Sequence, residues 1–325
     1  MNNYQKRVLE TRKNFLNLVK GTEKNIIKVY SKAAKELEEK LRTAKVGSKE
    51  EKYLSSMKRE LDNYVKVLRK DLKKELANGI KEASNLAAGI QISFFDNILE
   101  QSVEATFKRM FSTIADEAVK QMVAAGYYKD GKTLDTRLWN LTKKNAEDIE
   151  SLITTNIAKG SNSRELAKLV DKYINPKKIL KQNYVVKGMD RNISYQATRL
   201  ARTSLKHAFD ESYRRTAGAN PFTKGIKWNL SPSHYNRQVE KWGKDICDVY
   251  ATQNDYNLGV GVFPADKLPI SHPNCLCNLT TETTDLKDAR KELADWVKGG
   301  KNEKLDAWME TYGKEYGIDY RREYI

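Results

Sequence analysis

The sequence predicts a mainly α-helical protein with a long helical hairpin at the N-terminus and a small α+β module toward the C-terminus. Three observations support this fold class. Apolar residues recur at three- and four-residue steps through much of the first third of the chain. Charged residues make up 31% of the 325 residues, as in helical proteins with long exposed faces. Glycine (17) and proline (6) are few, which disfavours a chain made of turns and short strands.

The N-terminal domain, residues 1–132, is expected to consist of basic helices. Apolar positions predict one long helix over about 4–43, which ends before Val46-Gly47-Ser48. Ser48 followed by Glu51 resembles a capping box at the start of a second helix, which runs through Leu76. Two such helices form a hairpin that buries a narrow apolar seam and exposes a wide basic surface.

A third helix is predicted from about Phe107 to Met122, after a more apolar segment at 92–99. Aromatic residues and methionines at helical spacing are typical of a buried core or of a groove for a partner. The dipeptide Asp130-Gly131 then indicates a turn that ends this domain.

Residues 133–285 are predicted to form the α+β module, and residues 286–325 an amphipathic helical tail. The expected elements of the module, in chain order, are a helix from about Leu134, a short helix that starts at 164–170 and stops at Asn175-Pro176, a helix over 194–218, a strand at 225–231 and a short strand or turn at 260–264. The three cysteines and two of the three histidines fall in or beside the strand region, so we expect the small sheet to lie next to them.

The chain is strongly basic. Its net charge is +16 and its pI about 9.4, a balance that is typical of proteins with polyanionic partners such as DNA, or of a well-solvated surface rich in lysine. Three cysteines cannot all pair within one chain, which indicates a reducing compartment. No apolar run approaches the roughly 20 residues that span a bilayer, so we expect a soluble protein made in the cytoplasm, with no membrane partner.

Soft metal ligands concentrate in the segment Ser271–Cys277, which holds two of the three cysteines and one of the three histidines. A tetrahedral zinc site takes four ligands of this kind. The candidates are Cys247, His272, Cys275 and Cys277, with His234 in reserve. Asp245 or Asp248 is a candidate for holding an imidazole N–H from outside the ligand set. Four protein ligands would make a closed structural site, and three with a water an open one.

Other interpretations of the cluster remain open on sequence alone. Buried cysteines also pack as small hydrophobic side chains, without any metal. A nucleophilic pair of Cys275 or Cys247 with His234 is a further alternative, although no catalytic signature surrounds it.

Signs of other chemistry are few. Asp245, Asp248 and Asp255 would suit a hard cation of the kind that nucleases use, and equally suit solvated loops. No phosphate-binding loop is present, and Gly259-Val260-Gly261 lacks the third glycine and the helix of a dinucleotide fingerprint. The sequence therefore favours neither a nucleotide-binding enzyme nor a dehydrogenase.

Five short motifs follow one another between Arg199 and Cys277. They are Arg199-Leu200-Ala201-Arg202-Thr203, Trp228-Asn229-Leu230-Ser231-Pro232, Asp245-Ile246-Cys247-Asp248-Val249-Tyr250-Ala251, Gly261-Val262-Phe263-Pro264 and His272-Pro273-Asn274-Cys275-Leu276-Cys277. In this order they resemble the phage Mu F-like minor head proteins, also called phage head morphogenesis proteins, over about 135–280. Ser204 and Leu276 depart from the family pattern, in which glutamate and arginine are usual.

The resemblance implies a structural role without catalysis. Such proteins are minor components of tailed-phage heads that associate with the portal and support head assembly, DNA packaging or genome delivery. The implied location is inside the virion head near the portal. The implied partners are the portal protein, major capsid or scaffold proteins and packaged double-stranded DNA. The alternative is a DNA-binding or enzymatic effector, nuclease- or toxin-like, carried in the virion.

Overall fold

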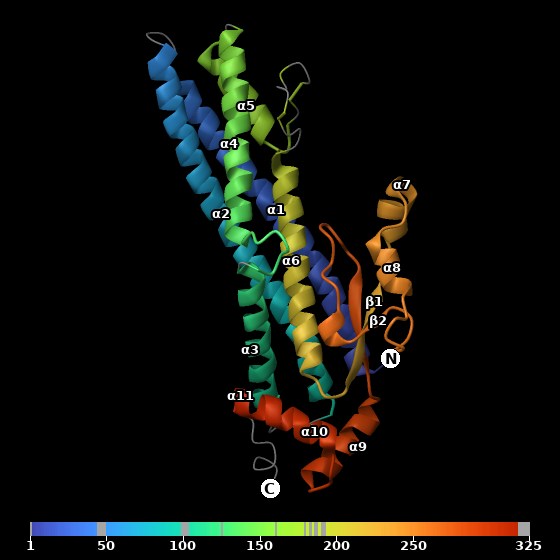
Figure 1. The fold of residues 1–325 in the computed structure, drawn as a ribbon. Helices are drawn as coiled ribbons and strands as arrows, with labels where there is room; N and C mark the ends of the chain where they lie inside the picture. Colours follow the sequence, from blue (N-terminus) through green and yellow to red (C-terminus); the bar gives the residue numbers. More distant parts are fainter. Residues whose placement is uncertain are drawn as a thin grey trace. The chain divides into compact units, whose positions relative to one another are not determined.

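The computed structural model describes residues 2–43, 50–98, 104–124, 126–159, 161–178, 180–181, 184, 188–189 and 193–317. In these ranges the chain is mainly helical, with one three-stranded antiparallel sheet in its C-terminal part (Figure 1). The predicted fold class, mainly α with a small α+β module, is therefore confirmed.

Two compact units make up the chain, and each combines segments that are distant in sequence. Unit 1 comprises Met1–Leu18, Ile80–Met122 and Thr203–Ile325, and unit 2 comprises Val19–Gly79 and Val123–Arg202. Three long helices each have residues in both units, namely α1 (Asn3–Thr43), α2 (Glu50–Asp96) and α6 (Ile193–Gly218). For that reason the units differ from the consecutive segments 1–132, 133–285 and 286–325 expected from the sequence.

Unit 2 contains the predicted antiparallel hairpin of α1 and α2. Asn25 on α1 donates a hydrogen bond to Glu75 on α2 at 3.1 Å, and farther along α1 the Lys40 ammonium lies 2.9 Å from the Glu60 carboxylate. Asn25 precedes Lys40 on α1, whereas its partner Glu75 follows Glu60 on α2, so the two helices run antiparallel. Buried residues on α1 recur at three- and four-residue steps, as the sequence pattern predicts: Ile26, Tyr30, Ala34, Leu37 and Leu41.

The remaining helices of unit 2 are α4 (Leu134–Ala158) and α5 (Ser163–Ile174). Asn162 caps α5 in a reciprocal capping box with Glu165. Asn145 on α4 donates a 2.8 Å hydrogen bond to the buried Tyr30 hydroxyl on α1. A polar contact therefore supports the apolar packing of this unit.

Helix α2 is longer than the sequence suggested, because it continues past Leu76 to Asp96. The Ala-rich segment near its end has good helix propensity, and the change of composition there does not interrupt the helix. Gln91 in this segment is fully buried, with its amide oxygen accepting from Asn220 and its amide nitrogen donating to Thr281. The capping box predicted for the start of α2 involves Ser48, which lies outside the described residues.

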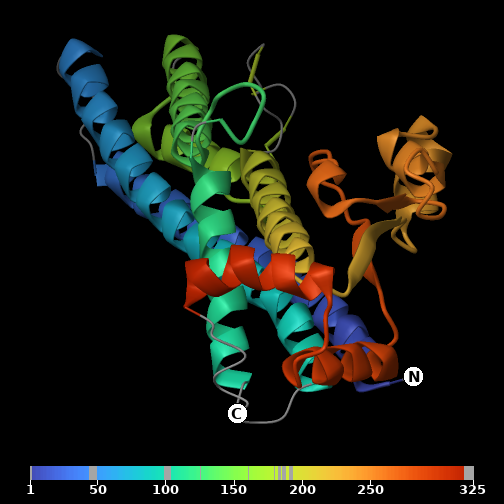
Figure 2. The ribbon, with the colours of Figure 1, turned by 60° about the horizontal axis from the view of Figure 1, so that its bottom comes forward.

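Unit 1 has an aromatic core. Rings from α2, α3 (Glu104–Val123) and the C-terminal segment pack together, with Phe107 stacked on Phe95 at 4.5 Å and on Trp308 at 5.9 Å between ring centroids. The C-terminal elements are α9 (Leu286–Val297), α10 (Glu303–Trp308), a π-helical turn η5 (Met309–Gly313) and α11 (Lys314–Tyr316) (Figure 2). These short helices cover most of the described part of the segment for which the sequence predicts a helical tail.

The sheet has the strand order β2-β1-β3 and is antiparallel throughout. Its strands are β1 (Thr223–Asn229), β2 (Val262–Phe263) and β3 (Asn278–Thr283). Trp228 pairs with Leu279 across one ladder, and Ile226 with Phe263 across the other. A side chain at Gly225 would lie 2.6 Å from Val262, so only glycine fits this crossing. We refer to residues 223–283, which include the sheet and the loops between its strands, as the Cys module.

Candidate metal centre

A short helix and a tight loop of the Cys module bring the three cysteines together. Helix α8 (Ile246–Thr252) begins with a capping box: the Asp245 carboxylate accepts from the Cys247 amide, and the Asp248 carboxylate accepts from the Asp245 amide, both at 2.8 Å. The cap fixes the first turn of α8, where Cys247 lies with its side chain buried.

The loop that carries the other two cysteines turns sharply before β3. Asn274 has a φ of +67°, a left-handed conformation that asparagine tolerates better than most residues. Its amide donates to the Thr203 hydroxyl on α6 at 3.0 Å, and the Cys275 amide donates to the His272 carbonyl at 3.2 Å. This geometry fixes Cys275 and then Cys277 at the entrance to β3.

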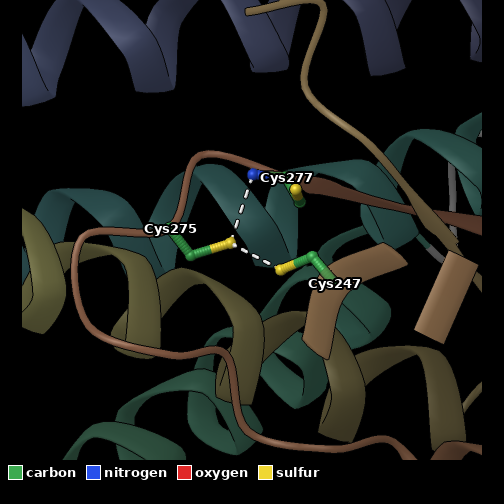
Figure 3. Close-up of side chains that lie close together, drawn as sticks. All are labelled: Cys247, Cys275 and Cys277. Carbon is green, nitrogen blue, oxygen red and sulfur yellow. Dashed lines mark hydrogen bonds between the residues drawn. The ribbon is translucent and has the colours of Figure 1, made fainter. Parts of the chain in front are cut away.

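The three buried thiols lie within bonding reach of one common ion. The sulfur atoms of Cys247 and Cys275 are 3.6 Å apart, and the three sulfurs lie within 4.8 Å of one another (Figure 3). Tetrahedral zinc with Zn–S bonds of about 2.3 Å separates its sulfurs by about 3.8 Å. None of the cysteines forms a disulfide. The cluster could therefore bind a metal.

His234 presents a ring nitrogen to this cluster. Its Nδ1 lies 3.9 Å from the Cys277 sulfur, and its Nε2 lies 3.0 Å from the Asp248 carboxylate. The side chain is 8% exposed. A carboxylate on one ring nitrogen commonly holds a histidine so that the other nitrogen faces a metal. The residue that the sequence analysis held in reserve thus has the orientation expected of a ligand, and Asp248 has the supporting position expected of it.

His272 lies beside the cysteine cluster, and each of its ring nitrogens lies near an oxygen atom that can accept a hydrogen bond. Nδ1 lies 2.9 Å from the Pro273 carbonyl, and Nε2 lies 3.2 Å from the Asp245 carboxylate. Its side chain is 32% exposed. A hydrogen bond with Cys275 raises the pKa of His272, against the opposing effect of burial. The ligand atoms of Asp245, Cys247 and His272 also lie within 4.8 Å of one another, whereas those of His234 group with Asp245 and Asp248, so both histidines remain candidates for the fourth ligand.

The thiols influence one another's protonation. Hydrogen bonds from Cys247 and Cys277 lower the pKa of Cys275, whereas the hydrogen bond to Cys275 raises the pKa of Cys247. The hydrogen bond with Cys247 lowers the pKa of Cys277, but Cys275 and burial outweigh it and raise that pKa to about 11. The close approach of the three thiols thus opposes their ionising together, and a bound cation would offset the repulsion among three thiolates.

A cavity of about 430 Å³ opens beside the cluster. Its lining includes both histidines, Cys275, Cys277 and the indole of Trp242, which is 79% exposed. The three cysteines are therefore close to a pocket that a small ligand or water can enter.

The structure gives less support to the hard-cation site that includes Asp255 and to the Cys–His nucleophilic pair. Asp255 belongs to none of the potential metal-binding groups formed by the described residues, so it does not complete a site with Asp245 and Asp248. The thiol contact of His234 is with Cys277 rather than with Cys275 or Cys247, the partners considered for a nucleophilic pair. Gly261 makes a tight turn into β2: its φ is +73°, and a Cβ there would lie 2.8 Å from a backbone oxygen.

Two charged residues near the cluster were not identified from the sequence. Lys206 on α6 is buried in an ion pair with Asp210 and lies 5.8 Å from the centre of the Trp228 ring. Arg12 on α1 donates a hydrogen bond to the carbonyl of Leu276. Lys206 and Asp210 are four residues apart on a helix, a spacing that does signal an ion pair, but nothing local to Arg12 connects it to a loop 264 residues away.

No family model, curated protein or solved structure matches this chain. Among the described residues, no helix has the length and apolar character needed to cross a membrane.

Proposed function

We propose that this chain is a minor head protein of a tailed bacteriophage, which acts near the portal in head assembly, DNA packaging or genome delivery. We further propose that one structural zinc ion holds its Cys module together. The proposal rests on the five motifs that resemble the phage Mu F-like proteins and on the contacts that join those motifs in space.

Direct contacts connect all five motifs. The Thr203 hydroxyl accepts from the Asn274 amide, which joins the first motif to the fifth. The Trp228 amide donates to the Gly261 carbonyl at 2.8 Å, which joins the second to the fourth. The Trp228 ring also lies 5.2 Å from the Tyr250 ring of the third motif. The sulfurs of Cys247 and Cys275, 3.6 Å apart, join the third to the fifth. Contacts that connect all five motifs favour the interpretation that they belong to one folded arrangement over the interpretation that they are chance matches.

Zinc fits the donor set of this module. Three thiols and one imidazole are ligands that structural zinc sites use, and a reducing compartment leaves the thiols available. Cys247, Cys275 and Cys277 would supply the sulfurs, and His234 the nitrogen, with Asp248 on its other ring nitrogen. Zinc in such a site contributes folding free energy, because the ligands are not preassembled in the unfolded chain.

A structural role also agrees with how the acidic residues are used. The carboxylates of Asp245 and Asp248 accept the backbone hydrogen bonds that begin α8, and both approach histidine rings. Carboxylates committed in this way support a helix and its histidines, which favours a structural role for them over nuclease chemistry, although their oxygen atoms and a His234 ring nitrogen also lie within 4.8 Å of one another.

The position of the protein in assembled particles tests the head-protein proposal. Heads of the phage that encodes the chain should contain it at low copy number, with density next to the portal. The Cys275→Ser variant should reduce both its incorporation and the phage titre, whereas Glu36→Gln, which changes an exposed residue of unit 2, should affect neither. Absence of the wild-type protein from purified heads would overturn the proposal.

A further inference from the structure

The net charge of the chain is divided unequally between its two units. Unit 2 contains 33 lysines and arginines and 18 aspartates and glutamates, which gives it a net charge of +15. Unit 1 contains 26 basic and 25 acidic residues, a net charge of +1. A general enrichment in lysine would raise the charge of both units alike, so the excess in unit 2 has a cause that is specific to that unit.

On the hairpin of unit 2, exposed cations form a stripe along each helix. Each residue of an α-helix is turned by about 100° from the one before, so residues four or seven apart lie on one side. Four cations of α1 and four of α2 each fall within an arc of about 80°, and no acidic residue lies in either arc between the first and the last of them. All eight side chains are exposed. We call these eight residues the lysine face: Lys20, Lys24, Lys28 and Lys35 on α1, and Arg59, Lys66, Lys70 and Lys74 on α2.

The lysine face carries charge that other residues do not neutralise. Each stripe lies on the side of its helix opposite the buried residues, such as Ile26 on α1 and Leu68 on α2. Among the described residues, none of the eight cations lies within 4.0 Å of a carboxylate. On α4, by contrast, Lys143 and Lys144 each lie within that distance of an acidic residue one turn further on. The lysine face is therefore open to an anionic partner.

The length of the α1 stripe fits a polymer of closely spaced anions. From Lys20 to Lys35 the helix rises by about 23 Å. A DNA duplex has one phosphate about every 3.4 Å along each strand, so a stripe of this length faces several phosphates at once. The long lysine side chains can reach them without a defined arrangement of bases.

The side chains around the stripes favour duplex DNA over two other anionic partners. In the described parts of α1 and α2, the large apolar residues that are exposed are Leu9 and Val67, and neither is aromatic. Proteins that bind single strands stack the bases on aromatic side chains, and helices that bind membranes insert large apolar residues. A face of cations alone suits the outside of a duplex, where the phosphates lie.

We propose that the lysine face binds the phosphate backbone of double-stranded DNA without reading its sequence. The proposal deepens the function proposed above, on which it rests for the setting in which the chain meets DNA. It assigns the contact to unit 2 rather than to the Cys module, and it requires no metal.

The salt dependence of DNA binding by the full chain tests this proposal. Binding to a fluorescently labelled duplex of random sequence is measured by anisotropy over a range of sodium chloride concentrations. The logarithm of the binding constant should fall linearly with the logarithm of the salt concentration, by about 0.9 for each phosphate that is neutralised. The test variant changes the α1 stripe as a whole: Lys20→Gln, Lys24→Gln, Lys28→Gln and Lys35→Gln. Its slope should be smaller by about 3 to 4, and its binding at about 0.1 M salt should be weaker by more than about tenfold.

Two control variants separate the lysine face from total charge and from folding. The first removes four exposed cations of unit 1: Lys287→Gln, Lys291→Gln, Lys298→Gln and Lys301→Gln. It loses the same net charge, and its slope should change by less than about 1. The second changes the four lysines of the α1 stripe to arginine and should keep the wild-type slope. Glutamine and arginine have helix propensities close to that of lysine, and circular dichroism checks that each variant keeps its helices.

Equal slopes for the α1 variant and the unit 1 control, or a wild-type chain that does not bind duplex DNA, would overturn the proposal. Binding to single-stranded DNA or to anionic lipid vesicles that is as strong as binding to the duplex would overturn the choice of duplex DNA. The head-protein proposal is tested by the content of purified heads, so a failure of either proposal can be told from a failure of the other.

Discussion

In unit 2, buried side chains recur every three or four residues along helices of 12 to 47 residues, whereas the strands and helices of the Cys module have seven residues or fewer. The module also exposes more apolar surface. Nine of the thirteen large hydrophobic residues that are exposed in the described parts of the chain lie between Leu230 and Ile270. Long helices can bury a continuous apolar stripe, whereas short elements and loops bury less, so we expect a metal cross-link to contribute more to order in the Cys module than in unit 2.

The two regions should therefore respond differently to metal removal, which is the largest effect we expect. Treatment with a strong chelator under reducing conditions should lower amide protection in the Cys module by about 100-fold, equivalent to about 2.7 kcal/mol for zinc present at 100 times its Kd. Peptides from unit 2 should keep their protection. Hydrogen exchange with mass spectrometry resolves the two regions. An equal loss of amide protection in the Cys module and in unit 2, or no loss in either, would contradict the expected difference between the two regions.

The two histidines should also differ in their effect on zinc affinity. His234→Ala removes the ring nitrogen that faces Cys277 and should weaken zinc binding by more than about 100-fold, whereas His272→Ala, which removes a supporting contact, should weaken it by less than about tenfold. The same chelator competition measures both variants. The reverse order would identify His272 as the ligand and His234 as the supporting residue.

In unit 2, a buried hydrogen bond offers a matched test that should be independent of metal. Asn145→Ala leaves the buried Tyr30 hydroxyl without its 2.8 Å partner and should cost about 1–3 kcal/mol of unfolding free energy. Denaturation followed by circular dichroism measures this cost. The same loss should occur with and without chelator, and a loss that depends on chelator would contradict the separation of the two regions.

The smallest effect is expected at the surface of unit 2. The Lys32 ammonium and the Glu36 carboxylate are 3.8 Å apart, and both side chains are exposed. Glu36→Gln should change the unfolding free energy by less than about 0.5 kcal/mol, because solvent screens such pairs. A larger change, measured by the same denaturation, would mean that charge rather than apolar packing stabilises the hairpin.

The sequence predicted the regions with regular periodicity better than those without it. Apolar steps located α1, and the alternating pattern at 225–231 located β1, because both patterns reflect burial directly. The end of α2 was missed because the change of composition near 87–91 suggested a break, whereas buried residues continue at three- and four-residue steps through Ile80, Ala83, Ala87, Ile90 and Phe94. The cysteines were identified as a cluster from their spacing, and their meeting depends on the α8 cap and on the left-handed turn at Asn274.

The surroundings of the site could not be predicted in the same way. The order of preference between His234 and His272 depends on which ring nitrogens face carboxylates, and this follows from the tertiary structure. The contact of Arg12 with Leu276 joins residues far apart in sequence, and on α1 this arginine looks like any other basic residue of an amphipathic helix. Contacts of this range leave no local signal in a single sequence.

Zinc K-edge X-ray absorption on the protein, purified reduced and without added metal, tests the metal centre most directly. We expect about one zinc ion per chain, with three sulfur ligands at about 2.3 Å and one nitrogen at about 2.0 Å, and the nitrogen contribution should be lost in His234→Ala. A protein that contains no zinc, or zinc bound only by nitrogen and oxygen, would contradict the account.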